Sequence, residues 1–220
     1  MYNFEPTAPV KFYNTKLPKA SLKMESWVSV KEYLTNRGLD WDTARYNGWY
    51  PSEEAGDSYL RIVIPSYSLQ TGNKFWQARS IFGHEPRYQS PHAARGDAVT
   101  LDRQAGGAGI FLQPMKINTY IVVEGPMDAL AAAGCCYNSI ALMGNTPSVE
   151  VLSLTAKLLR GKMAIVIPDS DAPQALVPTL AYLASQGVQC NFLIPPAKDL
   201  ADLSFEERVK LLSSGCWQSP

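Results

Sequence analysis

Short, almost entirely apolar segments alternate with helix-like segments through the second half of the chain. Four apolar segments are predicted to be strands, at residues 120–124, 139–143, 163–168 and 189–194. Helices are predicted between them, at residues 126–133, 148–160 and near 174–186. Strands that are apolar throughout are buried on both faces, so the pattern predicts a parallel sheet covered by helices on both sides. A last helix is predicted from Ser204, because S-F-E-E has the spacing of a capping box.

The first half of the chain has a less regular pattern. Residues 1–26 are rich in Pro, Lys and Ser and predict an extended leader. A helical period follows and ends at Gly38, a predicted C-terminal cap, and Asp40 is predicted to cap a second, short helix. The segments LRIVIPSY and NKFWQARSI predict two strands joined by a turn at residues 71–73. A glycine-rich stretch after them predicts at most a short strand at 109–112.

These elements predict an α/β fold in two parts. A smaller mixed α+β domain is expected at residues 27–117. A domain with a four-stranded parallel sheet flanked by helices is expected at residues 118–213, followed by a tail at 214–220.

Composition narrows the class of protein. Of the 220 residues, 46% are apolar and 18% are charged, which is typical of a globular chain and not of a disordered one. No apolar run approaches the roughly 20 residues that span a bilayer, and the N-terminus has no apolar core of the secretory kind. We therefore expect a cytoplasmic protein without a membrane partner. The four cysteines include no C-x-x-C pair and there are only two histidines, so a structural zinc site is not expected.

Acidic residues gather where the predicted strands end. Three of the four strand ends carry them: Glu124 with Asp128, Asp169 with Asp171, and Asp199 with Asp202. In a parallel sheet, ligands bind at the carboxyl ends of the strands. Carboxylates held close together repel one another unless a cation compensates, and Mg²⁺ prefers such oxygen ligands. The sequence therefore predicts a divalent metal site at this edge of the sheet, with Gly125 and Pro126 shaping the turn that directs Glu124 toward it.

Local roles for these acids stay open alongside the metal site. Glu124 and Asp128 could instead favour the dipole at the start of a helix. Asp169 and Asp171 could belong to a turn without metal, and Asp202 lies close to the predicted cap at Ser204.

Four motifs of the second half resemble those of a known family. VVEGPMDALAAA, ALMGNT, VIPDSDAP and PPAKDLADL are similar, in this order, to the motifs of the Toprim domain, a metal-binding module of bacterial-type primases, topoisomerases and some nucleases. The E-G-x-x-D-A-L form most resembles the primase branch. Upstream, EYLTNRGLDWDTARYNGWYP and the segment from LRIVIPSY to RYQSP are similar to the parts of primase catalytic cores that precede this domain. The resemblance covers roughly residues 28–212 and departs from the pattern at Ala201, where primases carry an acid.

The resemblance implies roles for individual residues. It implies a Toprim domain at 118–213 whose catalytic acids are Glu124, Asp128, Asp169 and Asp171. It implies metal binding by Glu124, Asp169, Asp171 and Asp199, and nucleotide or nucleic-acid binding by Arg79, Arg87 and Lys198. Arginine suits this task because its guanidinium can hold two phosphate oxygens at once. Exposed surface positions are the alternative for the two arginines, and core packing is favoured over base stacking for Trp76.

The function that the resemblance implies is a DNA primase-like nucleotidyltransferase with DNA-directed RNA polymerase activity, of the kind carried by phages. It would make short RNA primers in DNA replication by two-metal phosphoryl transfer with Mg²⁺ or Mn²⁺. Its expected partners are a single-stranded DNA template, ribonucleoside triphosphates, and a replicative helicase or another replisome protein. Two alternatives remain: a metal-dependent Toprim nuclease, and a non-catalytic nucleic-acid-binding module of the replisome.

Overall fold

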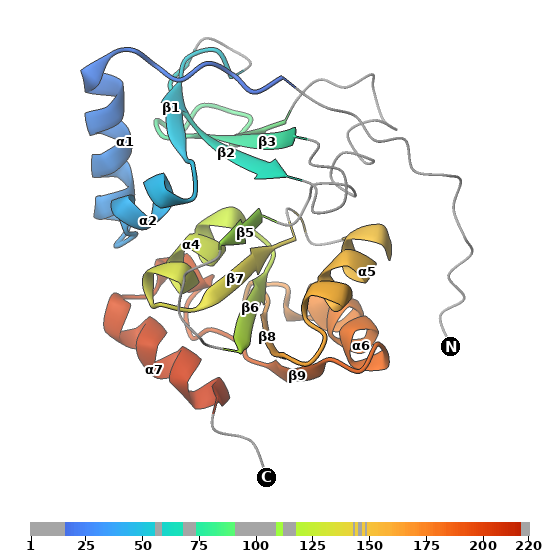
Figure 1. The fold of residues 1–220 in the computed structure, drawn as a ribbon. Coiled ribbons are helices and arrows are strands. Elements are labelled where there is room, and N and C mark those ends of the chain that lie inside the picture. The colour runs from blue at the N-terminus through green and yellow to red at the C-terminus, as the bar shows by residue number, and fades with distance from the viewer. Residues whose placement is uncertain are drawn as a thin grey trace.

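The computed structural model describes residues 16–55, 59–67, 74–90, 109–111, 118–142, 144, 147 and 149–216. The predicted turn at 71–73 and the cap position Ser148 lie outside the described residues, as do the first 15 residues and the end of the predicted tail. The described chain forms a small antiparallel sheet with two helices, beside a larger sheet with helices on both faces (Figure 1). Among the described helices, none combines the length and hydropathy that a membrane crossing needs.

The N-terminal part contains the two helices and two strands predicted for it, and two further short strands that the sequence did not predict, at residues 50–52 and 88–89. They are α1 (Met24–Asn36), α2 (Trp41–Tyr46), β1 (Tyr50–Ser52), β2 (Arg61–Tyr67), β3 (Lys74–Ser80) and β4 (Tyr88–Gln89). The strands pair antiparallel in the order β1-β2-β3-β4. Gly38 has a φ of 64°, a left-handed conformation that glycine adopts at little cost, and the Asp40 side chain accepts a hydrogen bond from the Thr43 amide at 2.7 Å. Both predicted caps are confirmed.

The end of the predicted leader is part of this domain. Helix α1 begins at Met24, within the stretch 1–26 that was expected to be extended, and Ser26 is already buried. The backbone before it lies against the sheet, where the Lys16 carbonyl accepts a hydrogen bond from Trp76 Nε1 at 3.2 Å and the Pro18 carbonyl accepts one from Tyr50 Oη at 2.8 Å. Trp76 is buried, so its predicted role in core packing is confirmed.

The C-terminal sheet has the strand order β5-β7-β6-β8-β9. Its strands are β5 (Gly109–Phe111), β6 (Thr119–Val123), β7 (Asn138–Ala141), β8 (Met163–Ile167) and β9 (Gln189–Phe192). Neighbouring strands from β7 to β9 pair parallel, which confirms the predicted four-stranded parallel sheet. Strand β5 adds an antiparallel edge next to β7.

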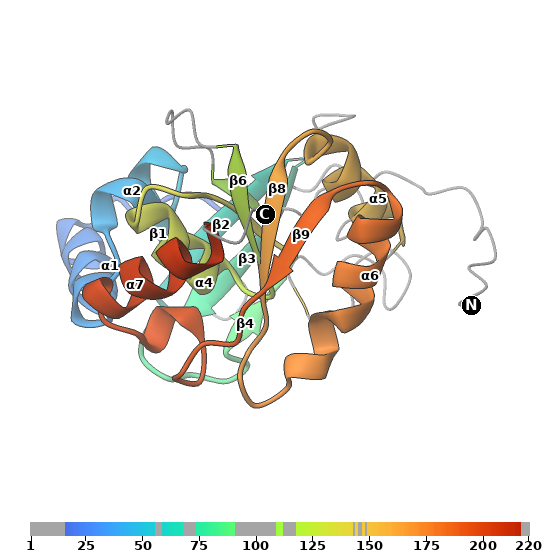
Figure 2. The ribbon, with the colours of Figure 1, turned by 90° about the horizontal axis from the view of Figure 1, so that it is seen from below.

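Helices cover both faces of this sheet. They are α4 (Pro126–Gly134) and α7 (Phe205–Cys216) on one face, and α5 (Val149–Leu158) and α6 (Val177–Ser185) on the other, with short 3-10 turns η1 (Pro173–Leu176) and η2 (Leu200–Asp202) (Figure 2).

The predicted capping box of α7 is confirmed. The Ser204 amide donates to Glu207 Oε2 at 2.8 Å, and the Glu207 amide donates to Ser204 Oγ at 3.3 Å.

One apolar core continues across residue 118, where the two domains are expected to meet. It includes Leu34 of α1, Ala44 of α2 and Ile62 of β2, together with Leu130 of α4 and Ile121 of β6. The alanines of α4 are buried throughout the helix, and their small side chains let the helix fit between the sheet and α2. The alanine-rich stretch of the sequence therefore joins the two parts of the molecule.

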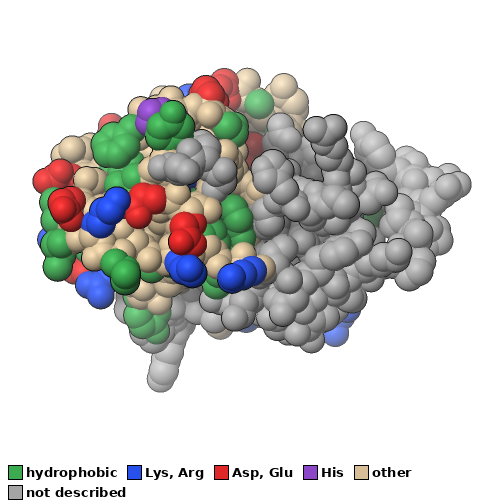
Figure 3. Space-filling view, turned by 90° about the horizontal axis from the view of Figure 1, so that it is seen from above, with side chains coloured by type: hydrophobic (Ala, Val, Ile, Leu, Met, Phe, Trp, Pro, Cys, Tyr) green, Lys and Arg blue, Asp and Glu red, His purple; other side chains and the backbone are tan. Residues whose placement is uncertain are grey.

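The described outer surface of the N-terminal part carries charges of both signs. Seen from above, acidic and basic side chains alternate there with apolar ones, and no single-sign field covers the described residues on this face (Figure 3). This agrees with the net charge of zero for the chain.

Candidate active site

The strand order places a crevice at the carboxyl ends of β6 and β8. The chain leaves β6 through α4 to reach β7 on one side, then crosses through α5 to β8 on the other side of β6. In open α/β sheets, the point where the strand order reverses in this way opens a crevice that binds ligands. Glu124 directly follows β6, and Asp169 lies two residues beyond the end of β8.

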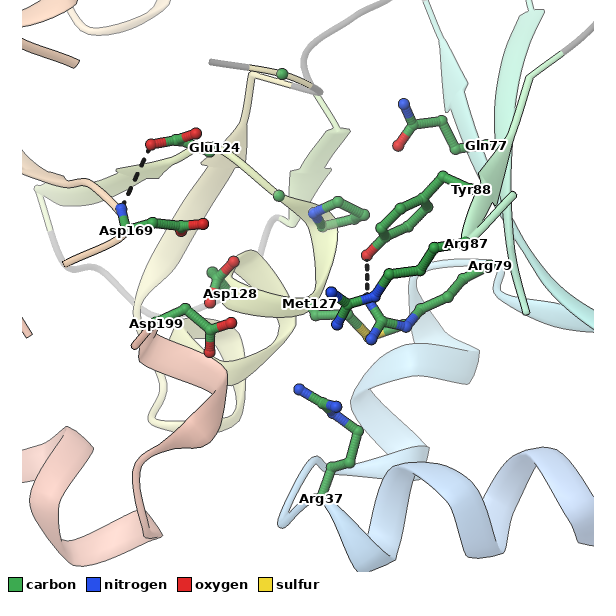
Figure 4. A pocket seen from close by; sticks show the side chains of 13 residues that line it. Arg37, Gln77, Arg79, Arg87, Tyr88, Glu124, Met127, Asp128, Asp169 and Asp199 are labelled. Carbon is green, nitrogen blue, oxygen red and sulfur yellow. Dashed lines mark hydrogen bonds between the residues drawn. The ribbon is translucent and has the colours of Figure 1, made fainter. Parts of the chain in front are cut away.

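A pocket of about 300 Å³ lies at this point, between the two sheets. It is lined by Arg37, Gln77, Arg79, Arg87, Tyr88, Glu124, Gly125, Pro126, Met127, Asp128, Gly144, Asp169 and Asp199. Figure 4 shows the acidic side chains on one wall and the arginines with Tyr88 on the opposite wall. The acids come from the C-terminal sheet and its helices, and the basic wall comes from the N-terminal part.

Glu124 and Asp169 lie side by side on the acidic wall. The Asp169 amide donates a hydrogen bond to Glu124 Oε1 at 3.4 Å, and both side chains are half-buried. Burial raises the pKa of Glu124, and the charges of Asp169 and then Asp171 raise it further. Burial also raises the pKa of Asp169, followed by the charges of Asp199 and Asp171. The fold therefore holds negative charges together, and a bound cation would relieve their repulsion.

Asp128 lies deeper in the same wall. Its Oδ1 accepts a hydrogen bond from the Ala201 amide at 3.0 Å, and the carboxyl is buried. Burial, and next the charge of Asp199, raise the pKa of Asp128 to about 7. A Cβ at Gly125 would stand 3.2 Å from Asp128 Oδ2, so glycine lets the turn approach this carboxyl closely. Ala201 is itself buried, and it contributes its backbone N–H to the bond with Asp128.

Asp171 and Lys198 do not line the pocket. Lys198 Nζ lies 3.7 Å from Asp171 Oδ2, and both side chains are more than half exposed. The Ser170 amide donates to the Lys198 carbonyl at 2.7 Å, which ties the D-S-D turn to the loop before η2. Asp199 lines the pocket and also caps η2, since its side chain accepts a hydrogen bond from the Asp202 amide at 2.8 Å.

Arg79 and Arg87 both line the pocket but differ in environment. Arg79 is 4% exposed: its Nε donates to Tyr33 Oη at 2.7 Å and its Nη1 donates to Tyr88 Oη. The guanidinium also lies over both rings, 5.0 Å from the centroid of Tyr88 and 5.9 Å from that of Tyr33. Arg79 is therefore not the exposed surface arginine of the alternative interpretation. Arg87, in contrast, is exposed, and its charge lowers the pKa of Asp169 across the pocket.

Arg37 belongs to the basic wall although no sequence pattern singled it out. It follows α1, and its Nη2 donates to Asp202 Oδ1 at 3.1 Å. Its Nε is buried and makes no hydrogen bond to the described part of the chain. The sequence could not indicate this contact, because Arg37 and Asp202 stand 165 positions apart in the chain.

Arg208 holds the backbone of the turn that contains Arg37 by hydrogen bonds. This buried side chain donates to the backbone carbonyls of Arg37, Gly38, Leu200 and Ala201. The shortest of these bonds joins Nη1 to the Gly38 carbonyl at 2.6 Å. Arg208 of helix α7 thereby clamps the turn after α1 against η2, which links the N-terminal part to the C-terminal domain.

The acidic wall fits a divalent ion that takes part of its coordination from a substrate. Within the described ranges, no group of three His, Cys, Asp or Glu side chains is arranged to hold a metal, so Glu124, Asp169 and Asp171 do not form a complete protein cage. Mg²⁺ is usually held by one or two carboxylates, waters and substrate phosphates. Glu124 and Asp169 offer two carboxylates on one wall of the pocket, which agrees with such a partial set of protein ligands.

Comparison with solved structures identifies the fold. No protein-family model matches the chain, and no curated protein sequence matches it. The RNA polymerase domain of Mycobacterium tuberculosis primase DnaG is similar in structure, with a TM-score of 0.62 and 17% identity over 90% of this chain and 78% of that one. The Aquifex aeolicus primase (zinc binding and RNA polymerase domains) has a TM-score of 0.62 and 21% identity, and the match covers 88% of this chain and 56% of that one. A DnaG primase catalytic domain bound to single-stranded DNA has a TM-score of 0.58 and 18% identity, and the match covers 90% of this chain and 74% of that one. The chain therefore has the fold of primase catalytic cores, which confirms the resemblance drawn from its motifs.

Proposed function

We propose that this protein is a primase-type nucleotidyltransferase that joins ribonucleotides on a single-stranded DNA template. The observation that carries the proposal is the pocket itself, in which acids at a strand-order reversal face arginines across a cavity of about 300 Å³. The primase-like fold supports the same activity, and one neighbour of that fold was solved with single-stranded DNA. The proposed domain limits are 118–213 for the second domain and, because α1 begins at Met24 and residues 16 and 18 bond to the sheet, 16–117 for the first.

The acidic wall is the proposed catalytic side. A divalent ion, Mg²⁺ or Mn²⁺, would neutralise charge on the reacting phosphate and on the attacking oxygen when bound there. Glu124 and Asp169 are the proposed first ligands, because both side chains line the pocket and the Asp169 backbone N–H bonds to the Glu124 carboxylate. Asp199 and Asp128 line the same wall, where Asp199 adds negative charge and the pKa of Asp128, about 7, makes its charge depend on pH. Asp171 is the proposed further ligand at the rim: its pairing with Lys198 is exposed, and such a pair stabilises by about 1 kcal/mol or less, so it exchanges readily.

The basic wall is the proposed side for triphosphate and template. Arg87 and Arg37 can each offer guanidinium donors to phosphate oxygens across the pocket from the acids. Arg79 is proposed as a positioning residue, since its donors hold the hydroxyls of Tyr33 and Tyr88 and so fix the Tyr88 ring at the pocket wall. Lys198 is proposed to contact template at the rim. Template contacts made by exposed cations depend on salt, because phosphate binding releases counterions.

The test is incubation of the full chain with single-stranded DNA, labelled ribonucleoside triphosphates and Mn²⁺, with products resolved by length. The proposal predicts labelled oligomers longer than a dinucleotide, and their loss in Asp169→Asn. Glu25→Gln, an exposed acid on α1, is the matched control and should synthesise oligomers as the parent does. Shortened DNA without labelled oligomers would instead identify the nuclease, and no change in either substrate would contradict both catalytic functions.

A further inference from the structure

A second concave surface lies on the outer side of α1 and α2. This α1–α2 groove has a volume of about 370 Å³ and is lined by Met24, Trp27, Val28, Lys31, Trp41 and Arg45. It shares no lining residue with the acid-arginine pocket. Both helices lie at the edge of the molecule in two perpendicular views (Figures 1 and 2), so a partner can approach the groove without entering the pocket.

Helix α1 presents two different apolar faces. Ser26, Val30 and Leu34 face the core and are buried. The groove residues Met24 and Val28 stand four positions apart and share another face, on which they are 74% and 46% exposed. A folded chain gains nothing from exposing a second apolar stripe, and exposed apolar surface with a polar rim is typical of interaction sites.

Two tryptophans and an arginine form the floor of the groove. The rings of Trp27 and Trp41 meet edge to face with centroids 6.1 Å apart, and the Arg45 guanidinium lies 5.9 Å from each centroid. Trp27 Nε1 donates to the Ser21 carbonyl at 2.9 Å, which fixes the ring. Trp and Arg are the residue types that most often dominate binding energy at protein interfaces. The floor is therefore already ordered, so a ligand would lose little entropy to organise it.

The charged residues of the groove favour a negatively charged ligand. Lys31 and Arg45 are exposed, and neither forms an ion pair within the described ranges of the chain. Two cations beside an apolar floor complement carboxylates beside an apolar side chain. The groove is thus electrostatically complementary to an acidic, partly apolar segment.

A peptide fits these features better than a nucleic acid does. Single strands bind along a track of cations with free aromatic faces for their bases. Here the two tryptophan rings pack against each other and against Arg45, and the neighbouring face of α1 carries the exposed acids Glu25 and Glu32. Exposed Asp42 follows Trp41 on α2. These acids would repel a continuous phosphate chain, whereas a short segment that contacts only Lys31 and Arg45 avoids them.

We propose that the α1–α2 groove binds an acidic segment of a partner protein. A bulky apolar side chain of that segment would enter the groove against Trp27 and Trp41, and flanking carboxylates would pair with Lys31 and Arg45. The surface is independent of the catalytic proposal, and it would dock the enzyme to another protein while leaving the pocket open.

The experiment selects random 12-residue peptides displayed on phage against the full chain, with counter-selection on the Lys31→Glu/Arg45→Glu double variant. The selected peptides should combine Asp or Glu with Phe, Trp or Leu. Measured by fluorescence anisotropy, their affinity should fall at least tenfold in Lys31→Glu and in Val28→Glu. Both substitutions lie at exposed positions, and thermal melting of each variant verifies its folding. Lys157→Glu, an exposed cation on α5, should bind the peptides as the parent does.

Three results would overturn the proposal. The first is a selection that enriches no peptide, and the second is an enriched set without acidic residues. The third is a folded Lys31→Glu variant that keeps peptide affinity but binds oligodeoxythymidine more weakly than Lys157→Glu does. That third result would assign the groove to nucleic acid.

Discussion

Replacing Arg79 with methionine separates a positioning role from phosphate binding. The substitution keeps much of the aliphatic volume and removes a guanidinium that is 4% exposed and bonded to the hydroxyls of Tyr33 and Tyr88. Hydrogen bonds to a charged group contribute about 1.5–3 kcal/mol each, so two of them amount to about 3–6 kcal/mol. Part of this is offset because a buried charge no longer has to be desolvated. We expect a net loss of about 2–4 kcal/mol in the free energy of unfolding.

The assay is urea unfolding of the parent, Arg79→Met and Arg87→Met under the same conditions. Arg87 is exposed, so its substitution should change the free energy of unfolding by no more than about 0.5 kcal/mol. Tyr33→Phe removes one of the two hydroxyls and should cause a smaller loss than Arg79→Met. If Arg79→Met unfolds as the parent does and loses only triphosphate binding, the positioning role is wrong and Arg79 is a phosphate ligand.

Three further predictions follow from the same contacts. Burial and the charge of Asp199 raise the pKa of Asp128 from 3.8 to about 7. Without metal, the free energy of unfolding of the parent should therefore fall as the pH rises from about 4 to about 7, because the folded state holds a proton that the unfolded state has lost. Urea titrations at each pH measure this fall, and Asp128→Asn should lack it. Arg87→Ala should reduce the slope of template affinity against log salt by about 1, measured by anisotropy, whereas an unchanged slope would remove Arg87 from the interface. Arg208→Met frees buried carbonyls and should destabilise the fold by about 3 kcal/mol or more; a change in melting temperature below that of Arg87→Met would contradict the clamp.

Local sequence patterns predict much of this fold because their physical causes are local. The apolar runs at β6 and β8 are buried on both faces, and the caps at Gly38, Asp40 and Ser204 need only neighbouring backbone groups. Acids that follow parallel strands must gather at one sheet edge, so the pattern also predicted that Glu124 and Asp169 would meet.

The features that the sequence did not predict depend on contacts between distant segments. Nothing local indicates that Arg79 is enclosed by two tyrosines, one of them 46 positions away, or that Arg37 reaches Asp202. The same is true of the antiparallel pairing of the predicted short strand β5 with β7, and of the core that continues across residue 118. Asp171 follows its strand as expected, but the fold turns it toward Lys198 at the rim.

Glu124 and Asp169 are proposed to hold a divalent ion together with substrate phosphate, and the position of that ion can be measured. A crystal grown with Mn²⁺, a ribonucleoside triphosphate and a short DNA template would locate the ion by its anomalous scattering. We expect an anomalous peak at the ordinary Mn²⁺–oxygen distance, roughly 2 Å, from both carboxylates and from phosphate oxygens of the triphosphate. A triphosphate bound in the pocket with its ion placed away from Glu124 and Asp169 would show that these two residues are not the metal ligands.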